Sequence, residues 1–264
     1  MSPARPLMFD LGRIRKSGIF GHVEYHRSLP STNTTARELF VPLLAHAPAL
    51  VLADEQTAGR GRGMREWWST AGALTFSLVI RPADIGLSQE NCPMLSLATG
   101  VAVHDMLAGE LTSTAISIKW PNDVYVQHQK ICGILSEHVT TDGQSGVIVG
   151  VGINVNNSLA HAPDDVRFRA TSMFDEQQQS FDLTQILLAT TARILHRANE
   201  LAQDAARIIQ PFNQNHLLNG RRVTVNSPTP VTGICREVNQ AGHIVIATAD
   251  GDVRIGSGEV VEWQ

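Results

Sequence analysis

Short hydrophobic runs of the kind that form buried β-strands recur along the first part of the chain. They cover residues 23–27, 50–53, 73–81 and 146–156. Two further β-rich runs, 115–126 and 130–139, are separated by a short polar segment and are expected to form a hairpin. These runs predict a β-sheet as the framework of this part of the chain.

Hydrophobic residues at helical spacing lie between and after these runs. Residues 31–33 (Ser-Thr-Asn) supply N-cap candidates for a helix that continues through Phe40. A second helix is expected over 91–109, with Pro93 tolerated in its first turn. The sequence Asp-Leu-Thr-Gln at 182–185 forms a capping box that opens a third helix.

The pattern changes near the C-terminus. A helical stretch, which Pro211 is expected to interrupt, ends at residues 219–220. Short strands separated by turn-forming residues follow at 222–225, 231–238, 243–248 and 252–256. The sequence therefore predicts an α+β domain followed by a small β-barrel, with the boundary near residue 218.

Composition limits the class of protein. The chain has 264 residues, of which 43% are hydrophobic and 17% charged, as is typical of a compact globular protein. A formal net charge of −4 argues against the broad basic surface of a nucleic-acid-binding protein, so any positive site has to be local. Cys92, Cys132 and Cys235 fit neither a disulfide framework nor a metal cluster and are expected to be small buried hydrophobes. Without a long apolar run, the sequence predicts a cytoplasmic protein with no signal peptide and no membrane partner.

Positive charge is concentrated in the segment TAGRGRGMREWW, residues 57–68. Glycines let the backbone approach a ligand closely, and arginines present forked donors that match phosphate and carboxylate oxygens. The spacing fits neither a P-loop nor a dinucleotide-binding glycine motif. Composition alone leaves four alternatives: a loop that closes over a polyanion, an ordinary surface loop, a chance turn, or an arginine–glycine tract for RNA.

Two other segments combine polar residues with unusual glycines. In residues 119–133, KWPNDVYVQHQKICG, a Trp-Pro turn precedes Asn-Asp at a strand end, and Gly133 leaves room for a ligand on the return strand. Spacing alone favours an ordinary hairpin turn with solvated lysines. In residues 149–156, VGVGINVN, two glycines in a buried strand indicate the close approach of a ligand or backbone, and Asn154 is a candidate to hold a nucleotide group or a metal-bound water.

In order and spacing, the segments STN, DEQTAGRGRGMREW, KWPNDVYVQHQKICGIL and GVGIN resemble the signature segments of biotin protein ligases. The resemblance implies an α+β fold in which residues 1–218 form a catalytic domain like that of biotin/lipoate ligases and class II synthetases, with a mixed central β-sheet and flanking helices. It implies a small SH3-like barrel at residues 219–264. The stretch before the first strand is too short for the helix-turn-helix with which some relatives repress biotin operons, so the resemblance is to the short form and no DNA binding is expected.

The resemblance implies a two-step acyl transfer. The carboxylate of biotin attacks the α-phosphate of ATP and gives biotinyl-AMP and pyrophosphate. A lysine of a biotin carboxyl carrier protein or domain, usually that of acetyl-CoA carboxylase, then attacks the acyl carbon. Fixed cations stabilise the first transition state because negative charge gathers at the α-phosphate. Biotin, ATP and Mg²⁺ are therefore the expected ligands, and a homodimer joined along a sheet edge is compatible with the family.

The resemblance also assigns roles by position. The catalytic candidates are Arg60, Arg62, Asp123 and Lys130. The biotin-binding candidates are Ser31, Thr32, Asn33, Gln56, Gly59, Arg60, Gly61, Arg62, Lys130, Gly133 and Gly150. The ATP-binding candidates are Arg62, Arg65, Trp67, Lys119, Asn122 and Asn154, and Asn154 is also the candidate Mg²⁺ ligand. Trp67 matches a position that stacks on adenine, and Lys130 matches one that binds the biotin carboxylate and then the adenylate.

The chain departs from the family pattern after Arg62, where Gly63 and Met64 replace a further basic residue or a differently placed glycine. This difference bears on loop closure and on retention of the adenylate. A lipoate–protein ligase is the nearest rival enzyme, but its usual Arg-Arg-x-Ser-Gly-Gly-Gly loop is missing from the sequence. A biotin-binding protein without turnover is the other rival, and the presence of Lys130, Asp123 and both loop arginines argues against it.

Overall fold

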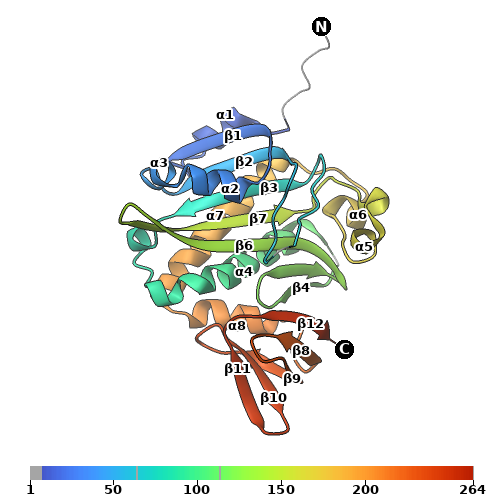
Figure 1. Cartoon of the computed structure of the whole chain (residues 1–264). Coiled ribbons are helices and arrows are strands. Elements are labelled where there is room, and N and C mark those ends of the chain that lie inside the picture. The colour runs from blue at the N-terminus through green and yellow to red at the C-terminus, as the bar shows by residue number, and fades with distance from the viewer. Residues whose placement is uncertain (1–7, 64, 113, 264) are drawn as a thin grey trace. The chain divides into compact units, whose positions relative to one another are not determined.

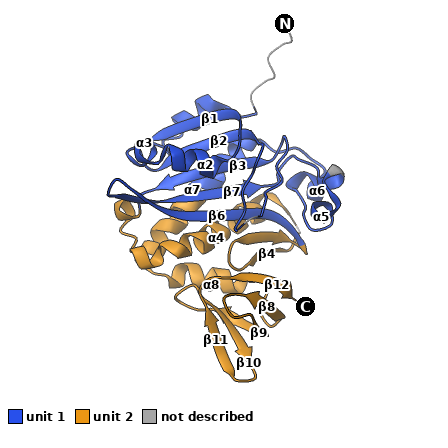
Figure 2. Ribbon diagram, viewed as in Figure 1, with its two compact units in different colours: residues 1–81, 129–192 blue, residues 82–128, 193–264 orange. Residues whose placement is uncertain are grey.

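The computed structural model describes residues 8–63, 65–112 and 114–263 (Figure 1). The chain forms two compact units, which Figure 2 shows in separate colours. The first unit comprises residues 1–81 and 129–192, and the second comprises residues 82–128 and 193–264. The division predicted at residue 218 stays a prediction, because the C-terminal strands lie within the second unit together with earlier parts of the chain.

The first unit is built on five neighbouring strands in the order β1-β2-β3-β7-β6. They are β1 (His22–Leu29), β2 (Ala49–Gln56), β3 (Leu74–Ile80), β6 (Gln129–Thr141) and β7 (Gln144–Ile153). β1 and β2 are parallel, and the other neighbours are antiparallel. β3 is buried at every position, including the polar Thr75 and Ser77, because both faces of the strand are covered. The predicted mixed sheet is confirmed.

Short helices accompany this sheet. They are α1 (Leu11–Lys16), α2 (Thr32–Glu38), α3 (Phe40–Leu44), η3 (Leu159–His161), α5 (Asp164–Arg167) and α6 (Met173–Gln177), and the longer α7 (Leu183–Gln203) begins in this unit and ends in the second. The helix predicted to run through Phe40 is in fact two helices, because Leu39 leaves the helical conformation with a φ of −97°. Asp182 opens α7 as predicted, and its Oδ1 accepts from the backbone N–H groups of Thr184 and Gln185.

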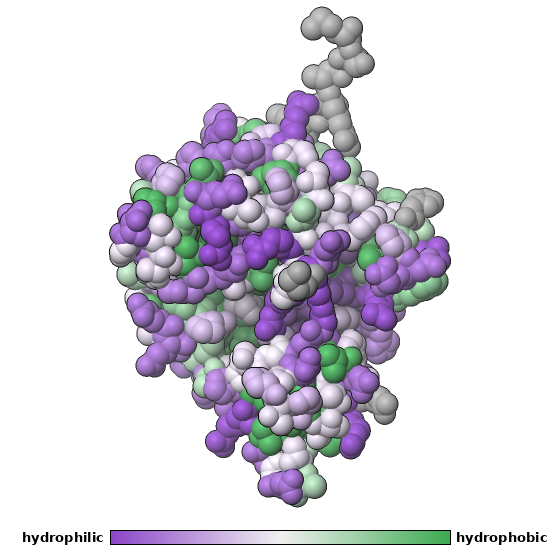
Figure 3. Space-filling model, in the orientation of Figure 1, coloured by the Kyte–Doolittle hydropathy of each residue, from purple (hydrophilic) through white to green (hydrophobic). Residues whose placement is uncertain are grey.

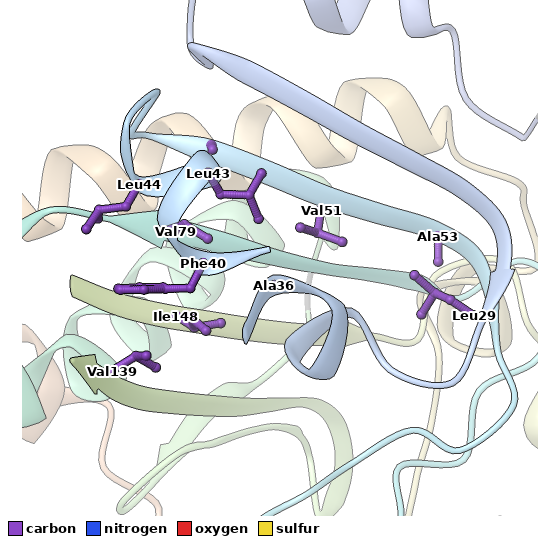
Figure 4. Close-up of a cluster of buried hydrophobic side chains, with 11 residues drawn as sticks. Leu29, Ala36, Phe40, Leu43, Leu44, Val51, Ala53, Val79, Val139 and Ile148 are labelled. Carbon is purple, nitrogen blue, oxygen red and sulfur yellow. The ribbon is translucent and has the colours of Figure 1, made fainter. Parts of the chain in front are cut away.

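A hydrophobic cluster fixes α2 and α3 against the strands. Ala36, Phe40, Leu43 and Leu44 of the helices pack against Val51, Ala53, Val79, Val139 and Ile148 of the strands (Figure 4). Burying a side chain of the size of Leu or Phe contributes roughly 1.5–3 kcal/mol. This packing holds the N-terminus of α2, with its predicted biotin-binding residues, in a fixed place over the sheet.

The second unit combines helices with a hairpin and a separate sheet. Its helices are η1 (Pro82–Ile85), η2 (Gln89–Met94), α4 (Leu95–Glu110) and α8 (Ala206–Gln214), and its hairpin pairs β4 (Ile116–Lys119) with β5 (Asp123–Val126). The sheet has the antiparallel order β11-β10-β9-β8-β12, with β8 (Arg222–Asn226), β9 (Val231–Val238), β10 (Ile244–Thr248), β11 (Gly251–Ile255) and β12 (Glu259–Trp263). This arrangement is consistent with the predicted SH3-like barrel.

Several sequence-based expectations for the second unit need correction. The run 115–126 is two strands, because the Trp120–Pro121 turn folds it back on itself. Pro211 lies inside α8, and the helical break comes instead before α8, at Asp204. Burial of the apolar face of α8 outweighs the one hydrogen bond that a proline removes. The strand β12 was not predicted as a separate strand.

The distribution of hydrophilic residues and the burial of the cysteines agree with what the composition predicts. Hydrophilic residues are spread over the face shown in Figure 3, with hydrophobic ones interspersed. Cys92, Cys132 and Cys235 are free and buried, as predicted, and burial raises the pKa of the Cys235 thiol to about 12. Among the described helices, none combines the length and hydrophobicity that a membrane-spanning segment requires.

Candidate active site

Small residues form a floor on one face of the first unit's sheet, where β3, β7 and β6 lie side by side. Two rows cross these strands: Thr75, Gly152 and Gly133 are register partners in one, and Ser77, Gly150 and Leu135 are partners in the other. Because glycines carry no side chain, this part of the sheet allows other groups to approach its backbone. We refer to Thr75, Ser77, Gly133, Gly150 and Gly152 as the sheet floor.

The N-terminus of α2 lies over the second row of this floor. An added Cβ at Gly150 would collide with Oδ1 of Asn33, so Gly150 makes room for the Asn33 side chain. Asn33 is 3% exposed, and its Nδ2 donates to the carbonyl oxygen of Leu135 at 3.1 Å. Its Oδ1 lies 2.6 Å from Oγ of Ser77. The structure therefore brings Asn33 and Gly150 together, as parts of one buried polar contact.

Gln56 completes the polar arrangement around α2. Its Oε1 accepts from the backbone N–H of Thr32 at 2.7 Å and lies 3.2 Å from Oγ1 of Thr32. Ser31 occupies the N-cap position as predicted, but its side chain makes no capping hydrogen bond. Gln56, at the end of β2, satisfies an N–H group of the first turn instead, so the segment before the arginine loop and the start of α2 are joined directly.

The arginine loop folds as a narrow hairpin. The N–H of Trp67 donates to the carbonyl of Gly59 at 2.8 Å, and the N–H of Gly61 donates to the carbonyl of Arg65 at 2.8 Å. An added Cβ at Gly59 would collide with the carbonyl oxygen of Trp67, so this pairing requires glycine. Gly63 has a φ of +64°, which favours glycine at the turn. Arg62 and Arg65 are exposed beside this turn, and Met64 lies outside the described residues.

Trp67 and Lys130 meet over the first row of the floor. An added Cβ would lie 2.5 Å from Cε2 of Trp67 at Gly152 and 3.1 Å from the Trp67 ring at Gly133. Nζ of Lys130 lies 5.8 Å from the centroid of the same ring. Within the described part of the chain, the buried Nε1 of Trp67 has no hydrogen-bond partner. The loop and the lysine, which are far apart in sequence, thus share one face of one unit.

Backbone contacts fix Lys130 at the start of β6. Its N–H donates to the carbonyl of Arg169 at 2.8 Å, and its carbonyl accepts from the N–H of Thr171 at 3.0 Å. The aliphatic end of the side chain turns toward Gly133, where an added Cβ would lie 3.3 Å from both Cε and Nζ. Gly133 therefore leaves the space that the Lys130 side chain enters.

Glu137, further along β6, is a carboxylate that contacts one of the loop arginines. Its Oε1 lies 2.9 Å from Nη2 of Arg37 and 3.4 Å from Nη2 of Arg60, and its Oε2 accepts from Nδ2 of Asn33 at 2.9 Å. Sequence reasoning missed Glu137, Arg37 and Ser77. Two signals were available in the sequence. Glu137 is a charged residue within a long strand, and Ser77 is a polar residue within a largely hydrophobic strand.

Asn154 has a structural role in the first unit. It is 3% exposed, its Nδ2 donates to the carbonyl of Thr171 at 3.0 Å, and its Oδ1 accepts from Nδ2 of Asn157 at 3.0 Å. The predicted nucleotide and Mg²⁺ roles of Asn154 stay predictions. Among the described residues, no group of three or more His, Cys, Asp or Glu side chains is arranged to hold a metal ion.

The other three candidates belong to the second unit. Lys119 and Asp123 are register partners on β4 and β5, and Asn122 lies in the turn between them. Nζ of Lys119 lies 3.6 Å from the centroid of the Trp263 ring and donates to the carbonyl of Val260 at 3.2 Å. Lys119 is therefore held against β12, the C-terminal strand of the same unit.

Comparison with known proteins identifies the family. Residues 25–154 match the model of the biotin/lipoate A/B protein ligase family. The biotin–[acetyl-CoA-carboxylase] ligase of Mycobacterium tuberculosis is 34% identical over 221 residues, which cover 80% of this chain and 78% of the relative. The chain belongs to the biotin/lipoate A/B protein ligase family. The resemblance noted in the sequence is thereby confirmed.

Other members of the ligase family give the same result. The bifunctional ligase/repressor BirA of Bacillus subtilis is 40% identical over 172 residues, or 63% of this chain, and the chain spans about half of that relative's length, 51%. The structure of a biotin protein ligase from Aquifex aeolicus in complex with biotin and ATP is similar with a TM-score of 0.79 and 30% identity, over 92% of this chain and 98% of that one. The fold predicted from the sequence is thus the fold of this ligase family.

Proposed function

We propose that the chain is an ATP-dependent biotin protein ligase. It activates biotin to biotinyl-5′-AMP with release of pyrophosphate and then transfers biotin to a lysine of a biotin carboxyl carrier domain. One observation carries the proposal: Trp67 and Lys130 meet over the sheet floor, and Arg60 of the same loop contacts Glu137 on β6 of the same unit. The similarity to a ligase whose structure holds biotin and ATP supports it further.

In the first step, a carboxylate oxygen of biotin forms a bond to the α-phosphorus of ATP. The bond from that phosphorus to the oxygen that bridges to the β-phosphate breaks, and pyrophosphate leaves with the electron pair. Lys130 and the guanidinium groups of Arg60 and Arg62 supply positive charge for the carboxylate and the phosphate. Preorganised donors of this kind lower the barrier because they do not have to reorient as charge develops.

The floor and α2 suit the uncharged part of biotin. Glycines at 133, 150 and 152 make room for the side chains of Lys130, Asn33 and Trp67, and Ser31, Thr32 and Gln56 place polar atoms at the N-terminus of α2. A ureido ring offers two N–H donors and one carbonyl acceptor, so polar groups of this kind match it. We therefore assign Ser31, Thr32 and Gln56 to the ring and Lys130 to the carboxylate end.

In the second step, the neutral amine of the acceptor lysine forms a bond to the acyl carbon, AMP leaves with the electrons of the anhydride bond, and the nitrogen releases one proton to water. The proposed acceptor is the carrier domain of a carboxylase, since the Mycobacterium tuberculosis relative is a biotin–[acetyl-CoA-carboxylase] ligase. Asp123, in the second unit, is the proposed aid to the incoming amine. The proposed setting is the cytoplasm, without DNA or membrane as a partner.

Mg²⁺ is assigned to ATP rather than to a protein site. Mg²⁺ usually binds through one or two carboxylates together with substrate phosphates. Asn154 remains the candidate residue on the metal side, and its two polar atoms are held in place by Thr171 and Asn157. We therefore derive no step from a protein-bound metal.

Biotin-dependent exchange of labelled pyrophosphate into ATP tests the first step. Exchange with biotin and not with lipoate is expected, and exchange with lipoate alone would assign the chain to the other branch of the family. Incubation with ATP, biotin and a purified biotin carboxyl carrier domain tests the second step, with a mass increase of one biotin on the carrier as the expected result. No exchange with either acid would instead indicate a binding protein without turnover.

A further inference from the structure

The side chain of Glu137 joins three parts of the first unit. It lies on β6 and is 16% exposed. Its Oε1 contacts Arg37 of α2 and Arg60 of the arginine loop, and its Oε2 accepts from Asn33 of α2. One carboxylate therefore ties the strand that carries Lys130 both to the helix over the sheet floor and to the loop.

The two arginine contacts differ in strength. Nη2 of Arg37 lies 2.9 Å from Oε1 of Glu137, whereas Nη2 of Arg60 lies 3.4 Å from the same oxygen. The Arg60 side chain is 43% exposed, and ion pairs of this exposure add little to the stability of a fold because water screens them. The Arg60 contact thus contributes little to folding, and its main physical effect is on the place of the guanidinium group.

The geometry leaves Arg60 able to serve a ligand at the same time. A guanidinium group has five N–H donors in a planar fork, and the Glu137 contact is made by Nη2. The three side chains Glu137, Arg37 and Arg60 together carry one net positive charge. An approaching anion therefore meets a cationic group whose direction is already set.

We propose that Glu137 is a positioning residue that holds the Arg60 guanidinium beside β6, the strand that carries Lys130, before substrate arrives. Its importance for catalysis rests on the proposed function, since Arg60 is read there as a donor to the α-phosphate. The tether itself does not depend on that function. Without it, the loop loses a contact to β6, and the guanidinium has to be ordered during the reaction, which lowers the rate.

Glu137→Gln tests the tether in the substrate-free protein. Glutamine has one acceptor oxygen and one NH₂ group, so it cannot accept hydrogen bonds at both ends as the carboxylate does. Limited trypsin digestion reports the loop directly, because trypsin cleaves after Arg62 and Arg65. We expect cleavage there to become about three- to tenfold faster in Glu137→Gln. Arg60→Gln removes the same ion pair by changing its more exposed partner. It is expected to increase the rate of cleavage after Arg62 and Arg65 by a similar factor.

Glu200→Gln is the matched control. Oε2 of Glu200 accepts from Nη1 of Arg197 at 2.7 Å, and the Glu200 side chain is 19% exposed, close to the value for Glu137. The same substitution at a similar ion pair on α7 should leave loop cleavage unchanged. Unchanged cleavage in both Glu137→Gln and Arg60→Gln would overturn the tether.

A double-mutant cycle on biotin-dependent pyrophosphate exchange tests the catalytic part. Glu137→Gln is expected to lower kcat about three- to tenfold with a much smaller change in the KM for biotin. In an Arg60→Gln background, Glu137→Gln should have little further effect, because the residue acts through Arg60. Equal losses in both backgrounds, or faster exchange in Glu137→Gln, would overturn the positioning role. Absence of exchange in the unmodified protein would overturn the proposed function instead, while the digestion still reports the tether.

Discussion

Trp67 packs directly on Gly152. A methyl group at Gly152 would lie 2.5 Å from Cε2 of the Trp67 indole, a distance at which one of the two groups has to move. Gly152 is fixed on both sides by its partners in β3 and β6, so the strand cannot give way easily. The missing side chain at position 152 therefore determines where the tryptophan of the arginine loop rests.

Gly152→Ala should displace Trp67 from the sheet floor. Because the indole is read as an adenine-stacking group, we expect the KM for ATP in pyrophosphate exchange to rise about tenfold or more. The fluorescence of Trp67 can be isolated by subtracting the spectrum of a Trp67→Phe variant. In Gly152→Ala, this fluorescence should shift toward that of an exposed tryptophan. Gly109→Ala is the control, since a Cβ at Gly109 meets nothing within 4 Å. An unchanged KM for ATP together with unchanged fluorescence would contradict the assigned position of Trp67.

Lys130→Ala should preserve the fold and abolish most adenylation. The side chain lies over Gly133 at one end of the floor, and removing one charge-stabilising donor typically lowers a rate by about 10²–10³. Pyrophosphate exchange at saturating biotin measures the loss, and thermal unfolding checks the fold. Lys16→Ala, at the exposed end of α1, is the control. An unchanged rate in Lys130→Ala would make Lys130 an ordinary solvated lysine.

Much of the fold was predictable because its signals are local. The hydrophobic residues of β3 follow from its burial, and the cap that Asp182 forms at the start of α7 follows from side-chain chemistry within one turn. The split of α2 and α3 at Leu39 and the passage of α8 through Pro211 were missed. In both places tertiary packing overrides the local preference, which periodicity does not report.

The site was only partly predictable, because the register between neighbouring strands and the packing of α2 decide which of its side chains come into contact. The glycines were recognised as places of close approach, but the sequence does not say that Asn33 fills the space at Gly150 while Trp67 fills the space at Gly152. The role of Glu137 depends on contacts that join β6 to α2 and to the arginine loop. The spacing of residues in the sequence does not reveal these contacts. Cross-strand register and helix packing fix these contacts only in the folded chain.

Asn33→Ala should destabilise the first unit. The substitution removes hydrogen bonds to the Leu135 carbonyl and to Glu137 and leaves Ser77 without the Oδ1 acceptor. Leaving buried polar partners unsatisfied costs roughly 1–3 kcal/mol, which urea unfolding measures. Thr34→Ala, one residue further along α2 and half-buried, should cost less than about 1 kcal/mol. Equal stability of the two variants would contradict the network described around Asn33.

His216 makes the stability of the second unit depend on pH. Burial lowers the pKa of His216 to about 4, against 6.5 in an unfolded chain, and the ring packs 5.2 Å from that of Phe212. Between these values the unfolded state binds a proton that the folded state excludes. The stability that the buried, neutral His216 contributes to the folded state is therefore fully present above pH 6.5 and is lost as the pH falls toward 4.

Lowering the pH from 7.5 to 5 should therefore reduce the free energy of unfolding by about 2 kcal/mol through this residue alone. His216→Gln keeps a neutral polar group at the position and has no titration in this range, so its stability should fall less steeply with pH. Urea unfolding of both proteins at several pH values isolates the difference, because the other histidines are common to both. Parallel curves would show that the pKa of His216 is the same in the folded and unfolded states, in conflict with its burial.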